Sequence, residues 1–255
     1  MSFGKPHSAV FLAAGYGARI SKLTQDPKSL LRICDQTLLE RHFSFLKENN
    51  IQEVRIVTGY KSELIQAYLK KLESNFDITH IFCKQYRERG NAYSLYLGIR
   101  DVEDQNVLIF DTDLVYEKSI LSNFIADNHE NSVLGGACAI DDLEATKILV
   151  DQNNLVRQFV DKRAILKQEL KYYRFSGEAM GILKFSSVSL SKLKKTCEQF
   201  FEEDNNLKCN WEPLLNLYLK EYPMNIHFNS SRLWVEIDTP EDFEKAKQLF
   251  SDCKR

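Results

Sequence analysis

The chain has 255 residues, of which 44% are hydrophobic and 27% charged, and its formal net charge is −2 at pH 7. This composition is typical of a globular protein and suffices for one large α/β domain or two small ones. The charge argues against a general nucleic-acid-binding surface, and no apolar run approaches the ~20 residues that cross a bilayer, so we expect neither nucleic acid binding nor membrane insertion.

Six cysteines are scattered along the chain without a Cys-x-x-Cys pair, so their spacing predicts neither a zinc site nor a disulfide framework. Residues 1–8 lack the apolar core of a secretory signal. Both features lead us to expect a cytoplasmic protein with reduced thiols.

The first part of the chain alternates short apolar runs with amphipathic segments. We predict strands at residues 9–13, 54–58, 78–83, 107–110 and 132–140, and helices at residues 38–49, 62–72, 90–99 and 119–126. Asn91 is expected to cap the third of these helices. Such alternation is typical of a largely parallel, helix-covered sheet.

The pattern changes near residue 145. Residues 147–151 and 155–160 predict a hairpin, and the polar stretch at 161–171 reads as an exposed insertion or a lid. Beyond it we predict strands at 179–185, 225–228 and 234–237, helices at 187–201 and 211–221, a loop at 205–210, and a last helix that starts at Asp238-Thr239-Pro240. The chain therefore reads as one domain, residues 1–255, with a smaller second lobe from about residue 145 onward.

The first predicted strand runs directly into a glycine loop, Ala13-Ala14-Gly15-Tyr16-Gly17. Glycines allow backbone conformations in which several amide N–H groups face one point and create an anion site. Arg19 and Lys28 add positive charge beside the loop. The loop is neither a Walker A motif, because no Gly-Lys-Ser/Thr follows, nor a dinucleotide fingerprint, because Ile20 stands in place of a third glycine. It predicts a triphosphate site, with a tight structural turn as the alternative.

Two pairs of carboxylates follow predicted strands, where α/β sheets bind ligands: Asp111 with Asp113, and Glu236 with Asp238. Mg²⁺ prefers hard oxygen ligands and usually takes one or two carboxylates together with substrate phosphates. If the two strand ends are neighbours, Asp113 and Asp238 can hold one Mg²⁺ against the triphosphate. Asp238 has a second interpretation, since a residue before Thr239-Pro240 can simply cap the last helix.

The glycine loop with Arg19 and Pro27-Lys28 resembles the signature of the nucleotidyltransferases that activate sugar phosphates and small alcohol phosphates. The resemblance continues through residues 38–40, residues 57–60 and Asp113 to residues 236–242, and so spans nearly the whole chain. Residues 91–97 are similar to a segment of bacterial phosphocholine cytidylyltransferases and 2-aminoethylphosphonate cytidylyltransferases. This resemblance implies an α/β protein with a GT-A-like (Rossmann-like) three-layer α/β/α fold and a central mixed sheet. It also implies Mg²⁺-dependent transfer of a nucleoside monophosphate, CMP from CTP in the subgroup, to a phosphate or phosphonate, with release of pyrophosphate.

The same resemblance implies roles for particular residues. Arg19 and Lys28 are expected to act on the triphosphate as catalytic cations, and Asp113 and Asp238 to bind Mg²⁺. Within residues 1–144, the nucleotide-binding part, we expect contacts to the nucleotide from Ala13, Ala14, Gly15, Gly17, Asn91 and Ser94. Residues 145–255 are expected to bind the acceptor and complete the sheet, with a cationic choline or aminoethyl head against Tyr173, Glu178, Trp211 and Glu212. For Trp211, a role in helix packing is an equal alternative.

Other functions fit parts of the sequence. A sugar-1-phosphate nucleotidyltransferase that uses UTP, dTTP or GTP, or a molybdenum-cofactor-type transferase, shares the signature, and a catalytically inactive nucleotide-binding module would keep the fold. A hydride-transferring oxidoreductase is disfavoured by the missing third glycine. The sequence specifies neither the exact acceptor nor the oligomeric state, and it is compatible with a homodimer.

Overall fold

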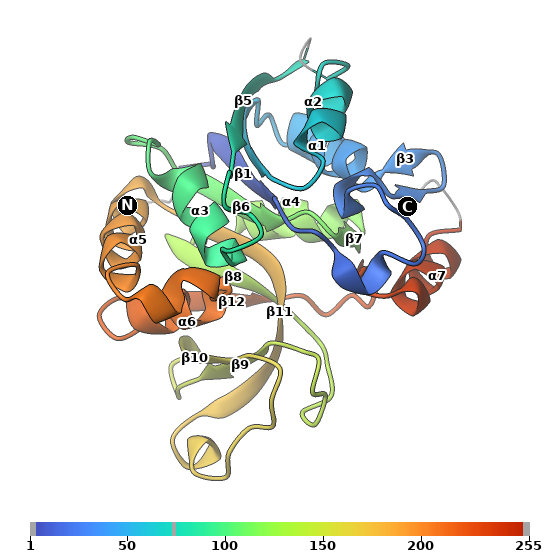
Figure 1. The fold of residues 1–255 in the computed structure, drawn as a ribbon. Coiled ribbons are helices and arrows are strands. Elements are labelled where there is room, and N and C mark those ends of the chain that lie inside the picture. The colour runs from blue at the N-terminus through green and yellow to red at the C-terminus, as the bar shows by residue number, and fades with distance from the viewer. Residues whose placement is uncertain (1–3, 73–74, 252–255) are drawn as a thin grey trace.

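The computed structural model describes residues 4–72 and 75–251. Its central sheet contains β1 (Ser8–Ala13), β4 (Glu53–Thr58), β5 (Asp77–Phe82), β6 (Val107–Asp111), β8 (Asn131–Gly136), β9 (Lys147–Val150), β10 (Leu155–Val160), β11 (Arg174–Phe185) and β12 (Met224–Phe228). Across the sheet, the strand order is β5-β4-β1-β6-β11-β8-β12-β10-β9 (Figure 1).

The sheet is mixed, as predicted. β1 pairs in parallel with β4 on one side and with β6 on the other, and β4 pairs in parallel with β5. β11 runs antiparallel to both β6 and β8, and β12 is parallel to β8. All six residues of β1 are buried, as expected for a central strand of a parallel sheet that is covered on both faces.

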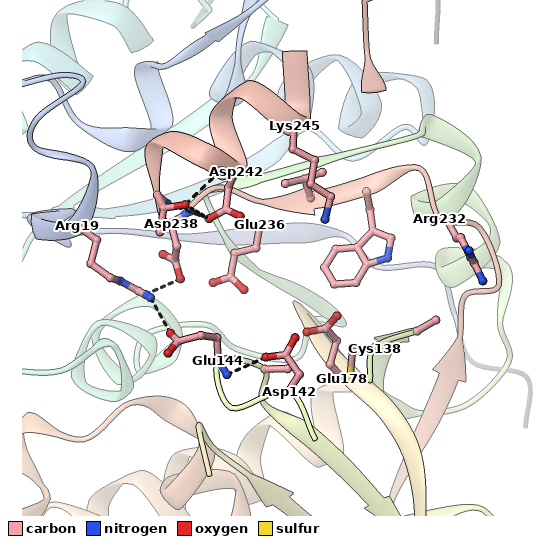
Figure 2. A pocket seen from close by; sticks show the side chains of 15 residues that line it. Arg19, Cys138, Asp142, Glu144, Glu178, Arg232, Glu236, Asp238, Asp242 and Lys245 are labelled. Carbon is pink, nitrogen blue, oxygen red and sulfur yellow. Dashed lines mark hydrogen bonds and ion pairs between the residues drawn. The ribbon is translucent and has the colours of Figure 1, made fainter. Parts of the chain in front are cut away.

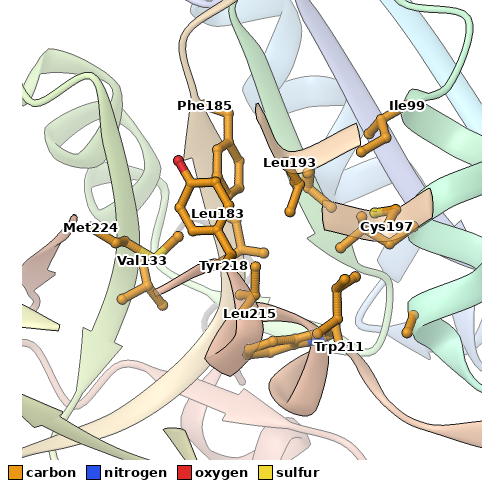
Figure 3. Close-up of a cluster of buried hydrophobic side chains, with 14 of the residues drawn as sticks. Ile99, Val133, Leu183, Phe185, Leu193, Cys197, Trp211, Leu215, Tyr218 and Met224 are labelled. Carbon is orange, nitrogen blue, oxygen red and sulfur yellow. The ribbon is translucent and has the colours of Figure 1, made fainter. Parts of the chain in front are cut away.

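Helices cover both faces of the sheet and create three layers (Figure 1). One face is covered by α1 (Leu38–Glu48), α2 (Ser62–Leu69) and α4 (Lys118–Ala126), and the other by α3 (Asn91–Ile99), α5 (Ser187–Phe200) and α6 (Trp211–Tyr218). Side chains of a strand alternate between the faces, so Phe11 of β1 joins the first core, whereas Val10 and Leu12 join the second. Figure 3 shows part of the second core, to which α6 contributes Trp211 and Tyr218.

A short strand pair beside the sheet brings two distant segments together. β7 (Leu114–Tyr116), just after β6, pairs antiparallel with β13 (Trp234–Glu236). β13 leads into α7 (Pro240–Leu249), which begins with a capping box between Thr239 and Asp242. A second small pair, β2 (Arg32–Ile33) with β3 (Gln36–Thr37), precedes α1. The ends of β6 and β13 therefore lie next to each other.

β11 crosses the molecule and pairs with different strands along its length. Its second half pairs with β6, and its first half pairs with β9. Between Ala179 and Leu183 its register with β8 shifts, and Gly181 in this bulge has a φ of +72°. A Cβ at this position would lie 2.9 Å from Oδ2 of Asp111, so glycine leaves room for that carboxylate at the end of β6.

Most predicted elements are present, with some ends shifted. The predicted strand 132–140 ends at Gly136, because the small residues after it line a hollow instead of pairing with a strand. The strand predicted at 179–185 begins at Arg174, because β9 supplies a pairing partner for its first residues. The predicted loop at 205–210 contains a 3-10 helix at Asp204–Lys208. β7 was not predicted from the sequence.

The predicted cap of α3 was wrong. Gly90 occupies the N-cap position, and Asn91 is the first helical residue. Asn91 Oδ1 instead accepts a hydrogen bond from the backbone N–H of Trp211, at 2.9 Å, and so caps the start of α6. This contact attaches α6 to α3.

Five cysteines lie in the described part of the chain, and four of them, Cys83, Cys138, Cys197 and Cys209, are free thiols. Cys34 Sγ donates to the backbone carbonyl oxygen of Phe250 at 3.1 Å, and Cys253 lies outside the described residues. In that same part, none of the helices combines the length and apolar character needed to span a bilayer.

Candidate functional site

The loop after β1 carries the two cations that the sequence singled out. Gly17 adopts a left-handed conformation, with φ 63° and ψ 45°, and starts a 3-10 turn at Ala18–Ile20 that contains Arg19. A second 3-10 turn, Lys28–Leu30, contains Lys28. A Cβ on Gly17 would lie 3.1 Å from Cγ of Lys28, so the glycine lets the two turns pack closely.

Two cations and three carboxylates form an ion cluster at the ends of β6 and β13: Arg19, Lys28, Asp113, Glu236 and Asp238. Lys28 Nζ lies 3.1 Å from Asp113 Oδ2 and 2.6 Å from Asp238 Oδ1. The Arg19 guanidinium pairs with Asp238. The structure thus brings together the four residues to which the sequence analysis assigned the triphosphate and the metal.

Backbone contacts explain why residues so distant in the sequence meet here. β13 pairs with β7, and the backbone N–H of Ile237 donates to the carbonyl oxygen of Asp113 at 2.9 Å. Thr239, not Asp238, is the N-cap residue of α7. The Asp238 side chain is therefore free to face Arg19 and Lys28 instead of capping the helix.

The ion cluster shifts the proton affinity of its members in opposite directions. Burial would lower the pKa of Lys28, but Asp113 and Asp238 outweigh it and raise that pKa well above its usual value. Burial would raise the pKa of Asp238, but Lys28 and Arg19 outweigh it and lower that pKa. Desolvation and repulsion from neighbouring carboxylates raise the pKa of Glu236 well above its usual range, although part of the residue remains exposed. The cluster therefore holds more acidic groups than its two cations balance.

The donor set of this cluster fits a hard divalent cation. Asp113, Glu236 and Asp238 each offer one carboxylate oxygen, and these oxygens lie within 4.8 Å of one another. Asp113 Oδ1 is buried and has no hydrogen-bond partner among the described residues, so it keeps an unused acceptor. Mg²⁺ prefers carboxylate oxygens and usually takes one or two of them together with substrate phosphates, so this set offers enough ligands.

A small hollow of about 190 Å³, here the inner hollow, opens beside the ion cluster on the face of β11 that carries Ala179 and Gly181. Trp211 lies on its wall but is 4% exposed, and its Nε1–H donates to Asp111 Oδ2 at 3.0 Å. The indole also meets the Phe159 ring edge-on, with centroids 5.5 Å apart. Trp211 therefore packs in the core and also supports the wall of the inner hollow.

Glu212 brings a buried carboxyl group to the inner hollow. Its Oε1 accepts a hydrogen bond from Thr146 at 3.1 Å, while Oε2 is buried without a partner among the described residues. Burial and the nearby Asp161 raise the pKa of Glu212 to about 7. The inner hollow thus offers one unsatisfied carboxyl oxygen to a ligand.

A larger hollow of about 640 Å³, here the outer hollow, lies on the other side of β11 (Figure 2). Successive residues of a strand face opposite sides, so Glu178 lines the outer hollow and Ala179 the inner one. The two hollows meet at four residues that line both: Arg19, Glu144, Glu236 and Asp238. Burial and the nearby Asp142 raise the pKa of Glu178 to about 7.

The remaining predicted site residues lie in different places. Asn91 lines the inner hollow. Ser94 is buried on α3, and neither Ser94 nor Tyr173 is among the residues that line the two hollows in the described structure. The predicted acceptor residues are therefore divided, with Trp211 and Glu212 at the inner hollow and Glu178 at the outer hollow.

Lys162 was missed by the sequence analysis. It lies in the polar stretch interpreted as an insertion, has a φ of 43°, and lines the inner hollow. Its Nζ lies 4.0 Å from Asp238 Oδ2. The available signal was a cation two residues after the end of β10, close to a strand end as the other site residues are. Glu236 was noted as a carboxylate at a strand end, and the geometry adds it to Asp113 and Asp238.

Comparison with known proteins gives a family match. A family model described as the MobA-like NTP transferase domain matches residues 9–164. The choline-phosphate cytidylyltransferase of Streptococcus pneumoniae is 22% identical over 253 residues, which cover 96% of this chain and 98% of that protein.

Two further similarities extend over nearly the whole chain. The bifunctional IPC transferase and DIPP synthase of Aquifex aeolicus is 27% identical over 250 residues, or 94% of this chain, and the chain spans about half (51%) of that relative's length. The solved structure of the inositol-1-phosphate CTP transferase from T. maritima superposes with a TM-score of 0.77 at 21% identity, covering 99% of this chain and 98% of that one. The structural similarity confirms the predicted nucleotidyltransferase fold.

Proposed function

The chain belongs to the MobA-like NTP transferase family, and we propose that it transfers CMP from CTP to the phosphate or phosphonate group of a small amine, such as phosphocholine or 2-aminoethylphosphonate, and releases pyrophosphate. The ion cluster supports the transfer step, and Glu212 supports the choice of an amine.

The proposed reaction at the ion cluster is a nucleophilic displacement at the α-phosphorus of CTP. An oxygen of the acceptor phosphate forms a bond to the α-phosphorus, and the bond between that phosphorus and the bridging oxygen breaks, so the electron pair leaves with pyrophosphate. The attacking oxygen is already anionic, so no general base is required. The obstacle is repulsion between an anion and a polyanion, which positioned cations lower.

The chain's own cations are placed for this task. Arg19 and Lys28 approach the ion cluster from the glycine-loop side, and Lys162 approaches from the end of β10. The raised pKa of Lys28 keeps its ammonium charged at neutral pH. Mg²⁺, held by Asp113, Glu236 and Asp238, would neutralise further phosphate charge when bound.

A cationic acceptor head is supported most directly by the carboxyl group of Glu212. Its Oε2 is buried, unpartnered and at the wall of the inner hollow, a few side chains from the ion cluster. An ammonium would satisfy this oxygen and stabilise the ionised carboxylate through its charge, whereas a neutral polyol offers no such charge. This argument favours an amine over the inositol 1-phosphate named for the T. maritima enzyme.

A substrate matrix tests the proposal. Pyrophosphate release is measured with CTP, UTP, GTP and dTTP, each against phosphocholine, phosphoethanolamine, 2-aminoethylphosphonate, inositol 1-phosphate and glucose 1-phosphate. We expect the highest kcat/KM for CTP with one of the amines. A higher value for a sugar or inositol phosphate would refute the acceptor class, and a higher value for another nucleotide would refute CTP.

A further inference from the structure

The outer hollow contains ionic side chains that the proposed transfer reaction does not use. It is lined by Glu178 of β11, Arg232 from the segment before β13, and Lys245 of α7. The Trp234 indole also lines it and packs directly on Gly136, where a Cβ would lie 2.6 Å from Cζ2 of the tryptophan. A rigid aromatic surface with charges around it is a typical small-molecule site.

Glu178, Arg232 and Lys245 make no close ionic contact within the described part of the protein, although Lys245 and Lys147 attract the Glu178 carboxylate from a longer distance. Among the described residues, none of these three side chains makes a hydrogen bond or an ion pair within 4 Å. Other ionic groups around the outer hollow do have partners: Glu144 pairs with Arg19, and Asp242 belongs to the capping box of α7. The unpaired groups are therefore available to a ligand.

Lys245 and Arg232 lie across the outer hollow from Glu178, and further carboxylates, among them Glu236 and Asp242, lie on the same side as Lys245. Figure 2 shows Lys245 and Arg232 extending from one side and Glu178 and Asp142 from the opposite side. A simple anion such as phosphate would meet the two cations but would be repelled by the carboxylates. A simple amine would match Glu178 but leave Arg232 and Lys245 without a partner. Only a group with both signs matches all three residues.

We propose that the outer hollow is a second ligand site, separate from that of the acceptor amine, and that it binds a small zwitterion with a carboxylate toward Arg232 and Lys245 and an ammonium toward Glu178. Trp234 offers an aromatic face to the part of the ligand between the charges, or to the ammonium itself. Burial of the Glu178 carboxyl, which opposes its ionisation, is offset when the ammonium binds.

A ligand in the outer hollow would bind next to the ion cluster. Arg19 lines the outer hollow and pairs with both Glu144 on its wall and Asp238 in the cluster. A carboxylate that enters the outer hollow competes with Glu144 for Arg19. We therefore expect the zwitterion to change the affinity of the protein for the nucleotide triphosphate.

Calorimetric titration with ω-amino acids tests the site. The probes are glycine, β-alanine, γ-aminobutyrate and 6-aminohexanoate, whose charges are separated by increasing distances, and the controls are n-butylamine and butyrate, each of which lacks one charge. We expect saturable binding of one zwitterion, at least tenfold tighter than either control. Arg232→Gln and Glu178→Gln should each weaken that binding at least tenfold, while Glu241→Gln, on the exposed first turn of α7, should not change it.

Two outcomes would overturn the second site. One is the absence of binding for every zwitterion, or binding that Arg232→Gln and Glu178→Gln leave unchanged. The other is a shared site: if Glu212→Gln, at the inner hollow, weakens binding of the zwitterion as much as Glu178→Gln does, the outer hollow is part of the acceptor site and not separate from it. Failure of the transfer reaction itself is scored independently, because these titrations need neither CTP nor turnover.

Discussion

Replacement of Lys28 by methionine tests whether the ion cluster holds a metal as well as substrate phosphates. The change keeps an unbranched side chain one atom shorter and removes the charge that faces Asp113 at 3.1 Å and Asp238 at 2.6 Å. The Lys28 side chain is 16% exposed, so this is a mostly buried pair, and loss of one partner from such a pair costs about 3 kcal/mol or more. In metal-free buffer, we expect Lys28→Met to unfold at a lower temperature than the parent.

Mg²⁺ should reverse this loss, because the metal and Lys28 compete for the same carboxylates. A cation at a concentration 100 times its dissociation constant stabilises the folded state by about 2.7 kcal/mol. A protein of this size gains about 2–4 °C in Tm per kcal/mol, so we expect an increase of about 5–10 °C in Lys28→Met and a smaller one in the parent. The activity should still fall by about 10²–10³-fold, since a positioned charge on the phosphates is lost.

Differential scanning fluorimetry over a Mg²⁺ series, with pyrophosphate release as the activity assay, measures both effects. Lys22→Met is the matched control, because Lys22 belongs to the same loop but is exposed and outside the ion cluster. If Lys28→Met shows the same Mg²⁺-dependent shift as the parent and near-normal turnover, the ion cluster is not the site of metal and triphosphate binding.

Three further changes probe the surroundings of the cluster. Glu212→Gln should weaken a pH dependence of stability. The native Glu212 carboxyl keeps its proton up to about pH 7, whereas the unfolded one releases it near its ordinary pKa of 4.5, so the stability of the parent falls as pH rises through that window. Thermal melts of the variant should show a smaller fall there, because Glu178, whose pKa is also raised to about 7, still contributes; an unchanged fall would contradict the role of Glu212. Gly181→Ala should lower stability by about 1–3 kcal/mol in urea titrations, because the φ of +72° strains alanine and its Cβ meets Asp111; an unchanged midpoint would contradict the bulge geometry. Asn91→Ala should lower the free energy of unfolding by about 1 kcal/mol, because α6 loses its cap, and should raise KM for the acceptor. An effect on KM for CTP alone would instead assign Asn91 to the nucleotide, as the sequence analysis expected.

Local sequence patterns were sufficient to predict the strands and helices of the parallel half. β1 and β6 are short, mostly apolar runs, β4 has Ile56 and Val57 at its centre, and α1 begins with a capping box between Thr37 and Glu40, so each element carries its own signal. β7 could not be found in this way, because three residues acquire strand structure only through pairing with β13. The start of β11 was missed for the same reason, since Arg174 becomes part of a strand only by pairing with β9.

Site residues were predictable where a charged side chain directly follows a strand or a glycine loop. They were less predictable where their position depends on the packing of distant segments. Arg19, Lys28, Asp113 and Asp238 all carry such local signals, and the structure places them together. The division of the acceptor candidates was not predictable. It depends on which side of β11 Glu178 faces and on where α6 places Trp211 and Glu212, and both are set by the tertiary structure.

The ion cluster also shows that the site depends on the whole fold. Asp113 comes from the part of the chain before residue 144 and Asp238 from the part after it, and the link between them is the pairing of β7 with β13. Neither part alone contains both carboxylates that face Lys28. The carboxylates repel one another, so the cluster is stable only when Lys28, Arg19 or a bound cation is present. Pairing of β7 with β13 must therefore be stabilised elsewhere, and the buried apolar residues Val115, Val235 and Ile237, which pack together with α7, supply that stabilisation.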